Sequence, residues 1–160
     1  MRLDSPLSEK PEERSRAIVA GLLSSQGQER GADLRDTLQH EMMDKASVFR
    51  DAGTLMAMRE KLKEIRSRYA NVKIEDRSRK YNTQLLEIFE LGILIDLADV
   101  LVEGALARQE SRGAHSREDF PERDDANFLK HTLAYLGPKG IDLAYKPVTI
   151  TKFEPKERKY

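Results

Sequence analysis

Cysteine and tryptophan are absent from the 160 residues. Without thiols the chain can form no disulfide, no thiolate zinc site and no cysteine nucleophile, and this absence fits a reducing compartment. Glycine-rich phosphate loops are also missing, because Gly21, Gly92 and Gly104 stand alone. The three histidines include no pair at the spacing of an HExxH zinc helix. We therefore predict no metal site, no thiol chemistry and no phosphate-binding loop.

An excess of charge of either sign is also lacking. Lys and Arg together number 28, and Asp and Glu together number 28. Nucleic-acid binding needs cations gathered on one face to meet phosphates. We therefore expect no nucleic-acid partner.

Membrane-targeting segments are not apparent either. Residues 1–6 are not an apolar run, which argues against a signal peptide. The stretch 85–106 is long enough to span a bilayer, but each acid at mid-membrane costs about 2.5 kcal/mol or more. We therefore expect no direct membrane insertion and read 85–106 as the central helix of a soluble bundle. The acids within it are Glu87, Glu90, Asp96, Asp99 and Glu103.

The fold class that these patterns predict is mainly α. An antiparallel bundle of three to four helices is followed by an irregular charged loop and a small β-hairpin with an extended tail. We expect one domain overall, a fragment of a larger subunit, in four segments. These are a lead-in and short helix (1–31), the bundle (32–109), a signature loop (110–127), and the hairpin and tail (128–160).

Helix boundaries follow from capping and periodicity. The first helix starts at Pro11, and the second starts near Asp33 as N-cap. Residues 51–53 form a tight connection, and the fourth helix opens near Asn82 or Thr83. The second helix has an apolar face of Leu34, Leu38, Met42, Ala46 and Phe49, and the third has a heptad seam of Leu55, Met58, Leu62, Ile65 and Tyr69.

The third and fourth predicted helices carry opposite charge biases. Five cations lie on the third helix, against five acids and no cation within 85–106. We expect these helices to pack side by side with complementary charges at the rim, each pair contributing only about 0–1 kcal/mol. The cations are Arg59, Lys61, Lys63, Arg66 and Arg68.

The C-terminal part changes from helical to strand-like periodicity. Residues 128–135 are compatible with a strand, 137–140 form a turn, and 141–145 alternate apolar and polar. Residues 147–151 extend the second strand at an edge. A two-stranded hairpin is marginal alone, so it must lean on the bundle or on a partner.

Between the bundle and the hairpin, residues 110–125 follow neither a helical nor a strand period. Gly113 and Pro121 interrupt both, yet Phe120 and the mixed charges are not typical of a linker. His115 lies between Arg112 and Arg117, an arrangement that suits an anion site or a proton relay. The alternative is an ionic loop that satisfies itself. His40 and His131 are read as structural, and the residues alone compose no complete active site.

The run Ser111–Asp125, Ser-Arg-Gly-Ala-His-Ser-Arg-Glu-Asp-Phe-Pro-Glu-Arg-Asp-Asp, resembles the signature loop in the C-terminal region of succinate dehydrogenase and fumarate reductase flavoprotein subunits. Similar short patterns occur at residues 48–50, 81–83, 125–133 and 155–160. The resemblance covers residues 32–160 and is poor before them.

The resemblance implies a supporting domain of an FAD-dependent oxidoreductase that interconverts succinate and fumarate. FAD would be a cofactor of the intact subunit, while the isolated chain would hold none and be inactive. The implied partners are the flavin-binding and capping domains of the same subunit and an iron–sulfur subunit, at the cytoplasmic, inner face of the cell membrane. No catalytic residue carries over. The positions expected to dock are Arg112, Gly113, His115, Arg117, Asp119, Arg123, Asp124 and Asp125.

Three other readings stay open at this point. In the first, the chain is a free-standing helical interaction module that docks through residues 110–125. In the second, it is the C-terminal region of a related flavoprotein such as L-aspartate oxidase. The third is a small independent enzyme that uses His115 with Arg112 and Arg117.

Overall fold

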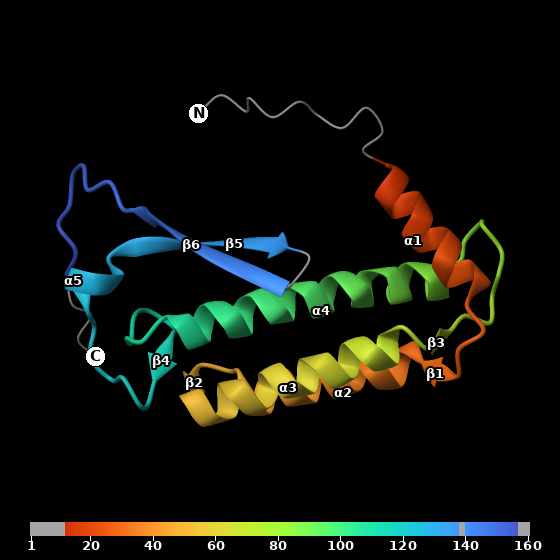
Figure 1. Ribbon diagram of the computed structural model, residues 1–160, viewed down its shortest axis with the longest axis horizontal. Helices are drawn as coiled ribbons and strands as arrows, with labels where there is room; N and C mark the ends of the chain where they lie inside the picture. Colours follow the sequence, from red (N-terminus) through yellow and green to blue (C-terminus); the bar gives the residue numbers. More distant parts are fainter. Residues whose placement is uncertain (1–11, 138–139, 157–160) are drawn as a thin grey trace.

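The computed structural model of the protein describes residues 12–137 and 140–156 (Figure 1). The expected lead-in and the last four residues of the tail lie outside this part. The helices are α1 (Glu13–Ser24), α2 (Gly31–Lys45), α3 (Ala52–Tyr69), α4 (Thr83–Ala107) and α5 (Asp125–Phe128). The strands are β1 (Glu29–Arg30), β2 (Phe49–Arg50), β3 (Val72–Lys73), β4 (Ser116–Arg117), β5 (Lys130–Gly137) and β6 (Gly140–Pro147). The helix-rich fold class is confirmed.

The core lies where α2, α3 and α4 meet. Figure 1 shows α2 and α3 running along one side of α4, with β5 and β6 on its other side. Leu55, Met58 and Leu62 of the heptad seam are fully buried, and Tyr69 at its end is partly buried. A smaller cluster of Leu22 and Ile88 with β3 joins α1 to the start of α4.

The start of α2 differs from the prediction. The helix begins at Gly31, and Asp33 lies in its first turn rather than at the N-cap. The reason is β1, which pairs in parallel with β3 and leads directly into the helix. Asp33 instead approaches Arg30, with 3.6 Å between Oδ1 and Nη1.

The connection between α2 and α3 also differs. Helix α2 ends at Lys45, so Phe49 belongs to β2 and is 72% exposed rather than part of the apolar face. The predicted connection at 51–53 is wrong, because Asp51 is the N-cap of α3. Its carboxylate accepts from the Thr54 N–H, and the Thr54 hydroxyl accepts from the Asp51 N–H, a reciprocal capping box.

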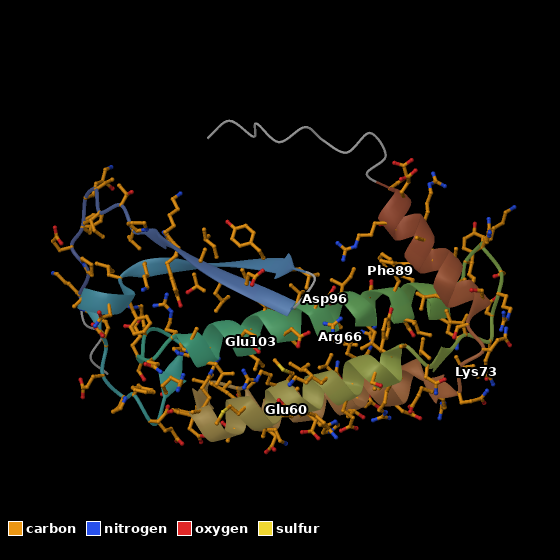
Figure 2. All side chains as sticks on the ribbon, in the orientation of Figure 1. Glu60, Arg66, Lys73, Phe89, Asp96 and Glu103 are labelled. Carbon is orange, nitrogen blue, oxygen red and sulfur yellow. The ribbon has the colours of Figure 1, made fainter. Side chains whose placement is uncertain are left out.

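Helices α3 and α4 lie side by side with opposite charges facing, as predicted. Arg66 bonds to Asp96 at 2.8 Å and also to Asp99, and Figure 2 shows Arg66 beneath Asp96. Arg59 approaches Glu103 at 3.8 Å. At the start of α4, Asn82 is the N-cap and accepts from the Leu85 N–H.

β5 and β6 pair antiparallel over eight residue pairs. The first strand starts at Lys130 rather than Phe128, because residues 125–128 form α5 with Asp124 as its N-cap. Figure 1 shows both strands over the second half of α4.

One face of α4 stays apolar and exposed. The hairpin covers only part of that side, and α1 covers the start of the helix (Figure 1). Among the described residues, none of the helices is long and apolar enough to cross a membrane. The exposed apolar residues of this face are Leu86, Ile93, Leu94, Leu97 and Leu101.

Candidate functional site

The signature loop folds back on itself directly after α4. The N–H of Arg112 donates to the carbonyl of His115, and the reverse bond is also made, which closes a tight turn at Gly113. Gly113 has φ +60°, a conformation that costs other L-residues about 1 kcal/mol. Ser111 closes the loop's base, donating from its hydroxyl to the carbonyl of Phe120.

A short parallel pairing ties the loop to the helices. β4 pairs with β2, and the N–H of Glu118 donates to the carbonyl of Arg50 at 2.9 Å. Residues 111–117 are therefore held against the connection between α2 and α3. This pairing places His115 close to Arg50, more than 60 residues earlier in the chain.

Arg117 is the buried centre of the loop, with 1% of its surface exposed. Its Nη1 donates to the carbonyls of Ala105, Leu106 and Arg108, at 2.8–3.3 Å. These oxygens belong to the last turn of α4 and the residue after it, where carbonyls lack helical partners and the dipole favours a cation. Arg117 thus caps the C-terminus of α4.

Asp119 completes this cap and extends it to a second helix. Its carboxylate accepts two bonds from Arg117, at 2.7 and 2.8 Å. One of its oxygens also accepts from the N–H of Ala52, at the start of α3. The Arg117 hydrogen bond is the main reason that the pKa of Asp119 is lowered to about 2. One ion pair therefore joins the end of α4 to the beginning of α3.

Glu110 is the second buried charge, with no exposed surface. It accepts from Arg108, from two nitrogens of Arg112 and from the N–H of Asp124. Burial alone would raise the pKa of Glu110, but these bonds lower it overall. Nη2 of Arg108 donates to the carbonyl of Lys130 at 2.8 Å, so the same cluster also holds β5 in place.

The remaining acids and Arg123 form the outer part of the network. Asp125 accepts from Arg112 at 2.5 Å and from Arg123 at 2.7 Å. Asp124 accepts from the N–H of Asn127 and caps α5. Most charged side chains of the loop therefore pair with each other. This arrangement agrees with the alternative of an ionic loop that satisfies itself.

His115 does not belong to the carboxylate network. Its Nε2 donates to the carbonyl of Arg108 at 3.1 Å. Burial lowers the pKa of His115, and the charges of Arg50, Arg117 and Arg108 lower it further, against the opposing effect of this bond. The ring lines a cleft of about 290 Å³.

All eight positions expected to dock lie in this one loop. The structure brings Arg112 together with Asp125, and Arg117 with Asp119, while Gly113 makes the turn. The positions predicted from the sequence did not include Arg108 and Glu110, which make most of the bonds in the second cluster. An Arg just after a long helix, two residues before an acid, was the available signal.

We next looked for metal-binding groups and cofactor-binding sheets among the described residues. Between residues 12 and 156, leaving out 138–139, no group of three or more His, Asp or Glu is placed to hold a metal ion. The sheets of the described residues are two-stranded, and none has the strand–turn–helix form that cradles a dinucleotide.

Comparison with known proteins then decides the family. Residues 35–160 match a family described as "Fumarate reductase flavoprotein C-term". The chain belongs to this family. The resemblance carried by the signature loop is confirmed.

Some relatives of this chain are named fumarate reductase flavoprotein subunits, and others are named succinate dehydrogenase flavoprotein subunits. The fumarate reductase flavoprotein subunit of Mycobacterium tuberculosis is 44% identical over 136 residues, which is 84% of this chain and 23% of that protein. The succinate dehydrogenase flavoprotein subunit of Rickettsia felis is 47% identical over 121 residues, which is 75% of this chain and 20% of that protein. The chain thus spans about a quarter of the length of such relatives.

Solved structures show the same fold. A structure of Escherichia coli quinol fumarate reductase superposes with a TM-score of 0.84 at 35% identity, covering 97% of this chain and 28% of that one. The likeness therefore includes α1, which lies outside the family match.

Proposed function

We propose that this chain is the structural C-terminal domain of a flavoprotein subunit that interconverts succinate and fumarate with FAD. It supports the catalytic parts rather than carrying out chemistry. The observation that carries the proposal is the family match over residues 35–160, together with a signature loop whose ion pairs hold α3, α4 and β5. The four sequence segments then act as one supporting domain.

The exposed face of α4 supports this role. Five large apolar residues are 37–58% exposed on one helix, where a self-sufficient protein would bury them. The family's relatives are about four times as long as this chain, so they contain chain that can cover this face. We infer that the flavin-binding and capping domains pack there, and that the iron–sulfur subunit lies nearby. The assembly would lie at the cytoplasmic face of the membrane without inserting this domain.

A full-length chimera tests the proposal. This chain replaces the corresponding quarter of the Mycobacterium tuberculosis relative, and the purified chimera is examined for bound flavin and for fumarate reduction with a dye donor. We expect flavin and turnover in the chimera and neither in the 160-residue chain alone. Flavin or turnover in the isolated chain would contradict the supporting role, and a chimera that folds without either would contradict the family function.

A further inference from the structure

Arg50 is the one arginine around the signature loop that has no ion-pair partner among the described residues. Its side chain makes one long bond, from Nε to the carbonyl of Val48 at 3.4 Å. Arg108, Arg112 and Arg117 each bond to a carboxylate instead. Burial lowers the pKa of Arg50, and the charge of Arg117 lowers it further. An uncompensated, partly buried cation of this kind is costly unless a partner arrives.

Arg50 lines the same cleft as His115. Arg108 and Thr132 add polar groups, but Arg108 is already engaged with Glu110, Phe128 and Lys130. The rest of the lining is aliphatic and comes from α4 and the hairpin, including Val100, Leu101, Ala134 and Leu143. The cleft therefore combines one available guanidinium with apolar walls.

His115 adds a group that responds to charge. Its Nε2–H is used by the carbonyl of Arg108, so Nδ1 of the neutral ring is unprotonated. The charged groups around the ring are Arg50, Arg117 and Arg108, while Asp119 and Glu110 are bonded to the latter two. An anion beside Arg50 would permit Nδ1 to protonate and become a second donor.

We propose that Arg50 and His115 form a binding site for a carboxylate, presented as an Asp or Glu side chain by the rest of the flavoprotein subunit. A single guanidinium matches a carboxylate through two parallel N–H groups, whereas a phosphate is usually held by several donors. The aliphatic walls fit the methylenes that accompany such a side chain.

The surroundings of the cleft favour a protein as the source. Leu101 lines the cleft and is 43% exposed, and the apolar face of α4 continues from it through Leu97 and Leu94. A free small acid would have no use for this extended face. The source of the carboxylate therefore rests on the proposed function, but the site itself does not.

The first experiment uses the 160-residue chain. Sodium propionate is titrated at constant ionic strength, with sodium phosphate in parallel, while NMR follows the Cε1–H resonances of the three histidines. We expect propionate to move the His115 resonance and raise its pKa, with little effect of phosphate. His40 and His131 are exposed and serve as internal references.

Matched variants locate the effect. Arg50→Gln should weaken propionate binding at least about tenfold, as loss of a charged partner does. Arg79→Gln removes an exposed arginine for which the described part of the chain provides no ion pair, and it should change nothing. A His115 resonance that ignores propionate, or an equal response in Arg50→Gln, overturns the site whatever the intact subunit does.

The second experiment places the same variants in the full-length chimera. Arg50→Gln should lower the chimera's melting temperature while leaving that of the isolated chain unchanged or slightly higher, because Arg50 has no ion-pair partner among that chain's described residues. Arg79→Gln should match the parent in both. A propionate response without an Arg50 effect in the chimera would assign the site to a free carboxylate and overturn the subunit contact. A chimera that folds without flavin would contradict only the proposed function.

Discussion

At the scale of single residues, the ions of the Arg117–Asp119 pair also bond to backbone groups at the ends of helices. Arg117 meets the carbonyls of α4 and Asp119 meets an N–H of α3. Charge pairing was predictable from the alternation of Arg and acids in the loop. The contacts to carbonyls were not, because they depend on where two helices end in space rather than on nearby sequence.

Asp119→Asn should destabilise the protein by about 3 kcal/mol, because it leaves the Arg117 charge buried without its partner. Urea unfolding followed by circular dichroism measures this loss. Asp44→Asn is the control, since Asp44 is 75% exposed and pairs with the neighbouring Lys45, and it should stay within about 0.5 kcal/mol. Equal effects of the two substitutions would show that the Arg117 pair contributes nothing special.

Acid should weaken the protein through the same carboxylate. The pKa of Asp119 is lowered to about 2 from its ordinary 3.8, chiefly by Arg117. A lowered pKa gives stability that is fully present above the unfolded value and is lost as the pH falls through the folded value, here between about pH 5 and about pH 2. The urea midpoint should fall over this range less steeply in Asp119→Asn than in the parent, and parallel curves would contradict the assignment.

Gly113→Ala should cost about 1 kcal/mol because φ is +60°, although nothing lies within 4 Å of the added methyl group. Gly21→Ala is a matched control with equal space in the second half of α1, where alanine is the better helix former. It should leave stability equal or raise it. Thermal melting of both variants compares them, and a harmless Gly113→Ala would mean that the turn does not need glycine.

At the scale of elements, periodicity predicted what each helix buries but not where short strands intervene. The heptad seam of α3 and the charge match with α4 were legible because both repeat with the helical period. Pairings of only two residues, such as β1 with β3 and β2 with β4, have no such signature. For that reason the start of α2 and the exposure of Phe49 were predicted wrongly.

Met58→Ala and Met56→Ala test the buried face of α3. Met58 is fully buried in the core, whereas Met56 is 46% exposed. Removing the first should cost about 2–5 kcal/mol and the second less than about 1 kcal/mol. Chemical denaturation compares them directly, and similar losses would place the core on the wrong face of the helix.

At the scale of the whole molecule, the domain has two unequal sides. The side of α4 toward α2 and α3 is packed, while the opposite side leaves leucines uncovered beyond the hairpin. The sequence pointed to this, since α4 is apolar almost all round. It did not show which residues remain exposed, because that depends on how far the hairpin and α1 reach.

Leu97→Gln should reduce self-association of the isolated chain without changing its stability by more than about 0.5 kcal/mol, because Leu97 is 58% exposed. Sedimentation velocity at several concentrations measures the association. Met43→Gln changes an apolar residue on α2 that is even more exposed, at 72%, but lies away from this face, and it should leave association unchanged. In the chimera, where we expect this face to be covered, Leu97→Gln should lower the melting temperature and Met43→Gln should not.

The bond from Ala52 to Asp119 also bears on the timing of folding during synthesis. These residues are 67 positions apart in the chain, so the first turn of α3 leaves the ribosome long before its carboxylate partner exists. Long-range contacts of this kind form late, because a large loop must close first. A nascent chain paused before residue 117 would therefore contain α1 to α4 without the ion pair that joins α4 to α3, and proteases should cut it faster than the complete chain.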